Sequence, residues 1–297
     1  MTIIDIRSVF TADPGHVLLE VDASQIEDRL VKALTGSPNL LHLASLEPGK
    51  VDVHRLAAAE IFHVIPEAVT KQQRDLGKRV VHATNYGMGA RTFQDGLVDE
   101  GYYIPLIECK RMIDARLAAN PEVLDWQRCT RIELLEYRQL VGIFGHTWRV
   151  PYDRMEGDLF RRAYAYRPQN GAATLVNQRM FIPLDRALQG GKFRGARIVN
   201  NVHDSVMVST PPEHAYDIAK FLLDSFEQPV DVFGHQLMVW AEVKVGKSWG
   251  RVGKVEYKRL PSRGEFEQVA SRLLPSAPSP TADAAAARAR RGKAAAP

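Results

Sequence analysis

The chain has 297 residues, 45% hydrophobic and 25% charged, which is ordinary for a globular protein with one large domain or two packed subdomains. It contains no apolar run near the ~18 residues that a membrane helix needs and no secretory signal, so we expect no membrane partner and a cytoplasmic location. The net charge of +4 permits a polyanionic partner without requiring one.

The predicted elements are a few short strands among many long helices. The first strand ends at Asp22, and two later strands flank His203 and Asp204, as in a hairpin with two polar residues at its tip. Without simple alternation of strand and helix, this order indicates an α+β fold. In chain order we expect a strand at 16–22, helices at 24–35, 53–63, 67–85, 106–117, 121–139 and 157–189, strands at 196–202 and 205–209, a helix at 212–227 and a strand at 236–245.

The last part of the chain differs in composition from the rest. From about residue 275 it is rich in Ala and Pro and contains no large apolar residue. Such a segment buries too little surface to offset the entropy lost on ordering, so we predict disorder there.

Asp22 and Asp204 are candidate metal ligands. A carboxylate at a strand end is held rigidly and is exposed to a cleft, and carboxylate oxygens suit Mg²⁺. Two such residues on adjacent strands can hold a pair of ions for phosphoryl transfer. Asp is also common in turns and helix caps, so the pattern by itself leaves both interpretations open.

A second candidate is one face of the helix predicted at 67–85. Four residues recur at intervals of four, which places them in one continuous stripe, and Gly87 follows as a natural helix stop. Two cations, an imidazole and a phenol can bind a triphosphate and stack on a base, although an ordinary solvated face has similar spacing. The stripe consists of Arg74, Lys78, His82 and Tyr86.

Two further segments carry polar residues of interest. Asp52 precedes an apolar helix and is a candidate N-cap. Gln169 and Asn170 lie in a helical stretch rich in small residues, where they either reach a nucleic-acid groove or face water.

Taken together and in this order, these segments resemble family A DNA polymerases over roughly residues 5–250. VDASQIEDRL resembles motif A, RDLGKRVVHATNYGM is similar to motif B, and VHDS resembles motif C. DVH at 52–54, FGHTWRVP at 144–151 and RPQNGAAT at 167–174 fall where similar strings fall in that family. Three motifs in the right order make the resemblance specific.

The resemblance implies a DNA-directed DNA polymerase that uses two Mg²⁺ ions. Asp22, Asp204 and the backbone carbonyl of Ala23 would be the metal ligands. Lys78 would be catalytic together with the two aspartates, and primed DNA template and deoxynucleoside triphosphates would be the partners.

The remaining roles also follow from the resemblance alone. Arg74 and Lys78 would hold the phosphates of the nucleotide, His54 its triphosphate tail, and Tyr86 would lie near the templating base. Glu27 would reject a ribose 2′-hydroxyl. The implied nucleotide-binding set is Arg74, Lys78, His82, Tyr86, Glu27, Gln25 and His54, and the implied primer–template set is His203, Arg29, Asn170 and Gln169.

Four positions depart from the family pattern. Ser205 replaces the usual Glu after the motif C aspartate, which removes one carboxylate. His82 stands where the family has Phe or Tyr, Ala23 where it has Tyr, and Asn170 where it has Gln. Metal preference and sugar discrimination are the properties that these changes affect.

The implied fold is an incomplete right hand, with an antiparallel palm sheet and helical fingers. We expect palm at 1–38 and 152–252, fingers at 39–151 and a C-terminal extension at 253–297. Because motif A begins near the N-terminus, we expect a split polymerase completed by a separate protein that supplies thumb and exonuclease domains, and a phage-derived origin fits such a gene. The alternatives are a catalytically inactive DNA-binding remnant and an unrelated metal-dependent phosphohydrolase.

Overall fold

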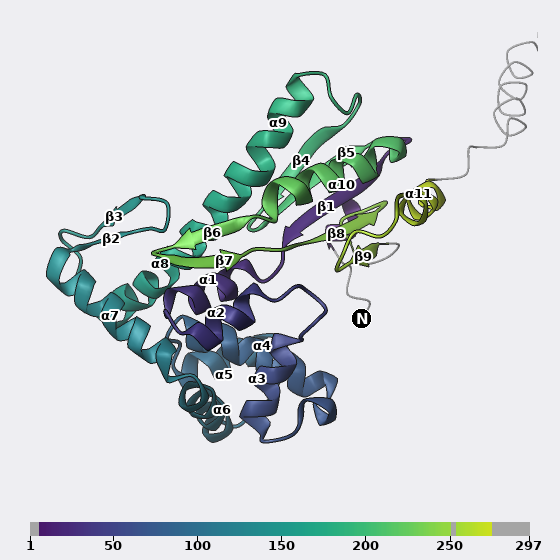
Figure 1. Cartoon of the computed structure of the whole chain (residues 1–297). Coiled ribbons are helices and arrows are strands. Elements are labelled where there is room, and N and C mark those ends of the chain that lie inside the picture. The colour runs from purple at the N-terminus through teal and green to yellow at the C-terminus, as the bar shows by residue number, and fades with distance from the viewer. Residues whose placement is uncertain (1–5, 251–253, 275–297) are drawn as a thin grey trace, which may run out of the picture.

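The computed structural model describes residues 6–250 and 254–274, so the predicted disorder from about 275 lies outside the described residues. An antiparallel sheet packs against helices on one side, and a separate group of helices lies below one end of it (Figure 1). The predicted α+β class is confirmed. Within the described ranges, no helix is long and apolar enough to cross a membrane.

The central sheet has five strands in the order β4-β5-β1-β8-β9, and every neighbouring pair is antiparallel. Its middle strand β1 pairs with β5 on one side and with β8 on the other. The strands are β1 (Val17–Ala23), β4 (Arg197–Val202), β5 (Ser205–Thr210), β8 (Ala241–Gly246) and β9 (Val255–Tyr257).

The two faces of this sheet differ because side chains alternate along a strand. Val17, Leu19 and Val21 of β1 point into the main core, where they pack with apolar residues of α10 (Pro212–Phe226) and α11 (Arg263–Arg272). The alternate residues Glu20 and Asp22 point to the opposite face. One face of the sheet is therefore covered by helices, and the other carries charged groups.

A long helical segment crosses the covered face of the sheet. It consists of α8 (Gly157–Val176), a π-helical turn (Asn177–Phe181) and α9 (Ile182–Gln189). The prediction of one helix at 157–189 is therefore correct in extent but missed the wider turn.

The helical group is built around its own core, to which Ile61, Leu76 and Phe93 contribute. Thr70 begins α4 with a capping box, in which its side chain pairs with the backbone of Gln73 and the Gln73 side chain returns to Thr70. Besides a 3-10 turn at Pro66–Ala68, the elements from 26 to 149 are α1 (Ile26–Leu34), α2 (Pro38–Ser45), α3 (Val53–Phe62), α4 (Lys71–Asn85), α5 (Ala90–Asp99), α6 (Leu106–Ala119), α7 (Pro121–Tyr137), β2 (Gln139–Val141) and β3 (Thr147–Arg149).

The strand predicted at 236–245 is wrong as a single element. It divides into β7 (His235–Met238), which pairs with β6 (Pro229–Val232), and β8 in the central sheet. Between them, the indole of Trp240 donates a hydrogen bond to the carbonyl of Ser45 at 2.9 Å, and the carbonyl of Trp240 accepts one from Ser24 at 2.8 Å. These contacts turn the chain from one sheet to the other.

Candidate active site

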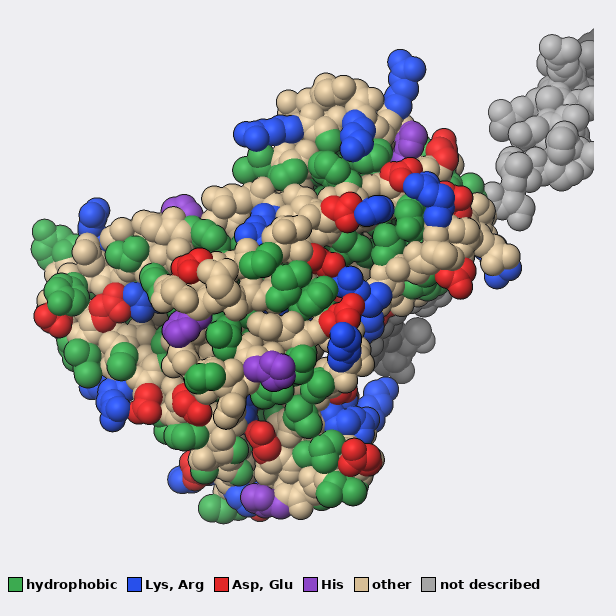
Figure 2. Space-filling view, viewed as in Figure 1, with side chains coloured by type: hydrophobic (Ala, Val, Ile, Leu, Met, Phe, Trp, Pro, Cys, Tyr) green, Lys and Arg blue, Asp and Glu red, His purple; other side chains and the backbone are tan. Residues whose placement is uncertain are grey.

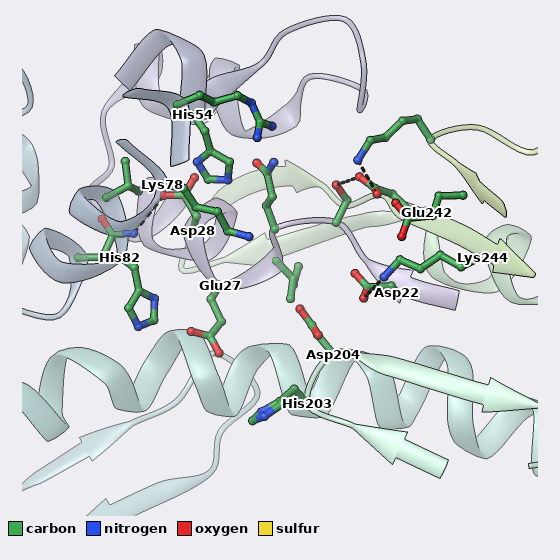
Figure 3. A pocket seen from close by; sticks show the side chains of 18 of the residues that line it. Asp22, Glu27, Asp28, His54, Lys78, His82, His203, Asp204, Glu242 and Lys244 are labelled. Carbon is green, nitrogen blue, oxygen red and sulfur yellow. Dashed lines mark hydrogen bonds and ion pairs between the residues drawn. The ribbon is translucent and has the colours of Figure 1, made fainter. Parts of the chain in front are cut away.

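A cleft of about 570 Å³ lies between the charged face of the sheet and helix α4. Acidic and basic side chains are intermixed on the surface where β8 and β9 approach the helical group (Figure 2), and Figure 3 shows the cleft from close by. The structure brings together in this cleft ten predicted site residues: Asp22, Gln25, Glu27, His54, Arg74, Lys78, His82, Tyr86, His203 and Asp204.

Asp22 and Asp204 are brought together by the register of two strands. Asp22 on β1 is paired with Ser205, the first residue of β5, and Asp204 immediately precedes that residue. The backbone N–H of Ala23 donates to the carbonyl of Asp204 at 2.8 Å, which ties the hairpin turn to β1. His203 has φ 51°, so the predicted hairpin tip of two polar residues is confirmed.

The environment makes ionisation of these carboxyls costly. Burial and then the charge of Asp22 raise the pKa of Asp204 to about 6. Burial also raises the pKa of Asp22, although the ammonium of Lys244, 2.8 Å from its Oδ2 atom, acts in the opposite direction. Two carboxylates in a partly desolvated site attract a cation that restores their charge balance.

The oxygen atoms at this position fit a hard divalent ion. Two carboxylates and a neighbouring backbone carbonyl are ligands that Mg²⁺ accepts. Among the described residues, no group of three or more His, Cys, Asp or Glu side chains is arranged to hold a metal ion. A magnesium ion here would therefore depend on Asp22, Asp204 and the backbone, with further oxygens from a ligand.

The opposite wall is the stripe on α4. Arg74, Lys78 and His82 point into the cleft from successive turns, and Tyr86 caps the helix. Nε of Arg74 lies 2.5 Å from Oδ2 of Asp52, whose Oδ1 accepts from the backbone N–H of Arg55 at 3.0 Å. Asp52 is thus the N-cap of α3, as predicted, and it also orients Arg74.

Tyr86 is linked to the sheet side of the cleft. Its hydroxyl donates a hydrogen bond to Glu27 Oε2, and the ring of His82 meets it edge-on with centroids 4.9 Å apart. Gly87 follows with φ 65°, so the predicted helix stop is confirmed. Gln25, with φ 53°, turns the chain sharply from β1 into α1 and so places Glu27 beside the cleft.

His54 lies at the edge of the cleft with only 6% of its surface exposed. Burial lowers its pKa to about 4, and nearby Lys78 acts in the same direction, so the imidazole is neutral at pH 7. Its Nδ1 atom is buried and has no hydrogen-bond partner within the described residues. A neutral imidazole in this place can donate to a ligand from one ring nitrogen.

Four residues predicted for the site do not line the cleft. Arg29 is buried and donates to the carbonyls of Ser24 at 2.8 Å, Leu46 at 2.9 Å and Ala44, so its guanidinium is engaged with the protein's own backbone. The Ala23 side chain is fully buried in the core. Gln169 and Asn170 are on α8, with Gln169 exposed and Asn170 packed against Gly142 outside the lining of the cleft. Their proposed contacts with DNA stay predictions.

Sequence reasoning missed the β8 and β9 wall of the cleft. Glu242 accepts a hydrogen bond from Ser24 Oγ at 2.9 Å and forms an ion pair with Lys258 Nζ at 2.6 Å. On the same strand, Lys244 contacts Asp22. The alternation in 236–245 was a usable signal, because it places Glu242 and Lys244 on the same face of a half-buried strand. The partner strand β9 lies in a short alternating stretch as well, because Val255 and Tyr257 separate Lys254, Glu256 and Lys258.

Comparisons with known proteins agree with this arrangement. Residues 2–251 match the model of DNA polymerase family A. The chain is 29% identical over 246 residues to the thermostable DNA polymerase I of Thermus thermophilus, covering 81% of this chain and 28% of that protein. It is 30% identical over 207 residues to DNA polymerase I of Pseudomonas aeruginosa (68% and 22%) and 23% identical over 257 residues to the DNA polymerase of Bacillus phage SP01 (83% and 27%).

Among solved structures, the POL domain of Pol1 from M. smegmatis in complex with DNA primer-template and dNTP has the same fold. The TM-score is 0.66 at 22% sequence identity, over 84% of this chain and 43% of that one. The chain spans about a quarter of the length of the curated relatives named above. The family match over most of the chain, on the fold described here, shows that it belongs to DNA polymerase family A.

Proposed function

We propose that this chain catalyses DNA-directed addition of deoxynucleotides to a primer 3′ end. The observation that carries the proposal is the single cleft in which Asp22 and Asp204 face the Arg74–Lys78–His82–Tyr86 stripe. Phosphoryl transfer needs charge neutralisation and positioning rather than covalent chemistry, and these groups provide both. The relatives that support this activity are DNA polymerases.

In this proposal, Asp22, Asp204 and the carbonyl of Ala23 hold two Mg²⁺ ions. When bound, such ions activate the primer hydroxyl and neutralise the leaving pyrophosphate. The register between β1 and β5 holds the two carboxylates in place, so little reorganisation is needed when the ions bind.

The α4 stripe is proposed to bind the incoming nucleotide. Arg74, oriented by Asp52, and Lys78 would pair with the phosphates, and neutral His54 would donate to the triphosphate tail. Glu27, held by Tyr86, would stand against the sugar, and Tyr86 would lie near the templating base. Gln25 would contact the nucleotide and His203 the primer terminus.

We further propose that residues 39–151 serve as fingers and that 1–38 and 152–252 serve as palm. The separate helical core around Ile61 and the sheet core around Leu19 support this division. A separate polypeptide that supplies thumb and exonuclease functions remains part of the proposal. Tight, processive extension by the purified chain alone would contradict that part.

Primer extension with Mg²⁺ and four deoxynucleotides tests the activity. Asp22→Ala and Asp204→Ala should each reduce the rate about a thousandfold, since each removes a ligand worth roughly 4 kcal/mol in the transition state. Asp95→Ala, which changes an exposed carboxylate on α5, is the matched control and should extend normally.

Three outcomes separate the alternatives. Extension that both cleft substitutions abolish supports the polymerase. Absence of extension with duplex binding intact, even after a lysate of the source cells is added, supports a catalytically inactive DNA-binding remnant. Extension that appears only after such an addition supports a polymerase completed by a second protein.

A further inference from the structure

Lys244 is a cation placed directly on a candidate metal ligand. It lies on β8 opposite Glu20 of β1, and its ammonium reaches diagonally to Asp22 Oδ2 at 2.8 Å (Figure 3). Only 16% of the Lys244 side chain and 26% of the Asp22 side chain are exposed. The pair is therefore shielded from solvent much more than a surface ion pair.

Lys244 also has a second acceptor. Its Nζ atom lies 3.4 Å from Oε1 of Glu20, while the other carboxylate oxygen of Glu20 is paired with Lys254. The ammonium can therefore leave Asp22 and keep a carboxylate partner. In the structure a single ammonium position contacts both carboxylates, with Asp22 nearer than Glu20, so loss of the Asp22 contact would leave Lys244 beside Glu20.

Glu20 is also paired with a part of the chain that lies outside the family match. That match ends at residue 251, whereas Lys254 immediately precedes β9, which pairs with β8 as the edge of the sheet. Helix α11 follows, with the side chain of Phe266 fully buried in the main core. This segment is thus a packed part of the fold, and it contributes a charged residue to the network that reaches Asp22.

A metal ion on Asp22 would compete with the ammonium. Mg²⁺ binds carboxylate oxygens at about 2.1 Å, and an ammonium on the same oxygen would repel it. Lys244 also reduces the charge of the Asp22–Asp204 pair from −2 to −1 when both are ionised. Ser205 stands where a third carboxylate would add negative charge, so this site attracts a divalent ion less strongly than a site with three carboxylates.

From this geometry, and resting on the proposed metal site, we propose that Lys244 is a positioning residue that acts as a tethered counter-ion. It neutralises Asp22 until a divalent ion binds, then moves to Glu20, and so sets the metal affinity of the site. Lys244 would make this chain need a higher metal concentration than a chain with a neutral side chain there.

The test is a titration of the full chain with Mn²⁺, followed by electron paramagnetic resonance of the free ion, without nucleotide or DNA. Lys244→Met keeps the aliphatic stem and removes the charge, and it should lower the Mn²⁺ Kd about tenfold. Lys244→Gln, a second neutral variant in case the first does not fold, should act in the same direction. Lys244→Arg keeps the charge and should stay near wild type.

Lys258→Met is the matched control, because Lys258 lies on the same wall but pairs with Glu242 and is 61% exposed. It should change the Kd by less than about twofold, since solvent and salt screen an exposed charge. Equal or weaker Mn²⁺ binding by both neutral Lys244 variants would overturn the role of Lys244 alone. If Asp204→Asn leaves Mn²⁺ binding unchanged, the proposed metal site itself is wrong, and the role of Lys244 with it.

Discussion

Tyr86 at the end of α4 donates its hydroxyl hydrogen bond to Glu27 at the start of α1, across 59 residues of sequence. Burial and the negative charge of Glu27 both raise the pKa of the Tyr86 phenol, so it stays protonated and remains a donor. The bond fixes the Glu27 carboxylate beside the cleft and connects the helical group to the sheet side of the molecule. The proposed sugar selection therefore depends on Glu27 and on Tyr86, which holds the Glu27 carboxylate in place.

The first prediction concerns this pair. Glu27→Ala removes the side chain that would exclude a 2′-hydroxyl, so ribonucleotide use relative to deoxynucleotide use should rise about ten- to a hundredfold. The measurement is kcat/KM for both nucleotides on one primed template. Tyr86→Phe keeps the ring and removes only the hydrogen bond, and it should give a smaller increase. An unchanged ratio in Glu27→Ala would show that Glu27 has no role in sugar selection.

The second prediction concerns pH and Asp204. Burial and Asp22 raise its folded pKa to about 6, whereas an unfolded Asp titrates near 4. The folded state therefore binds more protons between these values, and the stabilising contribution is complete below about pH 4 and is lost as pH rises through 6. At pH 7 in EDTA, Asp204→Asn should raise the free energy of unfolding by about 2 kcal/mol.

Urea unfolding from pH 4 to 8 checks this, and the difference from wild type should shrink toward pH 4. Asp95→Asn, an exposed carboxylate, should change stability by less than about 0.5 kcal/mol throughout. If the effect of Asp204→Asn on the free energy of unfolding did not change with pH, the surroundings of Asp204 would not raise the pKa of its carboxyl.

The third prediction concerns a buried ion pair on α1. Asp28 accepts from Lys32 and, at 3.0 Å, from Nδ2 of Asn85, and both charged side chains are almost completely buried. Burial would raise the pKa of Asp28, but Lys32 and Asn85 lower it to about 2, so this stabilisation is present above pH 4 and is lost as pH falls toward 2.

Asp28→Asn or Lys32→Met alone should cost about 3–5 kcal/mol, because each leaves an unpaired buried group. The double substitution should cost clearly less than the sum, as a double-mutant cycle by urea unfolding would detect. Lys220 and Asp224 on α10 have the same spacing but are exposed, and their coupling should be about 0.5 kcal/mol or less. Additivity at Asp28 and Lys32 would contradict the prediction.

The fourth prediction concerns the contact between α3 and α4. A Cβ atom at Gly77 would lie 2.9 Å from Cβ of Ala58 and 3.0 Å from the carbonyl of His54. Gly77→Ala should therefore push α4 away from α3, at a cost of about 1–3 kcal/mol, and raise the KM for nucleotide because Lys78 moves with α4.

Gly96→Ala is the control for Gly77→Ala. A Cβ atom there meets nothing within 4 Å, so Ala should stabilise α5 by up to about 1 kcal/mol. Thermal unfolding and nucleotide KM measured for both variants would check the pair. If Gly77→Ala changed neither the thermal unfolding temperature nor the nucleotide KM, the two helices would be able to separate without cost.

The sequence by itself determined the features that depend on neighbours along the chain. Local alternation and turn chemistry predict the strand that carries Asp22, the hairpin tip at His203 and Asp204, and the N-cap at Asp52. The strand ends at Ala23, one residue later than predicted. The stripe on α4 follows from helical spacing. Local preferences act over a few residues, so they are readable without knowing how the chain packs.

The tertiary structure decided which of these features meet. The β1–β5 register places Asp204 beside Asp22, and the β1–β8 register brings Lys244 to the same carboxylate, from 222 residues away along the chain. Tertiary packing also binds the guanidinium of Arg29 to the backbone of the α2 region, while its contact with DNA stays a prediction. The alternation within each strand shows which face is buried, but β1 is far in sequence from β5 and β8, so no local pattern shows which residues of these strands pair.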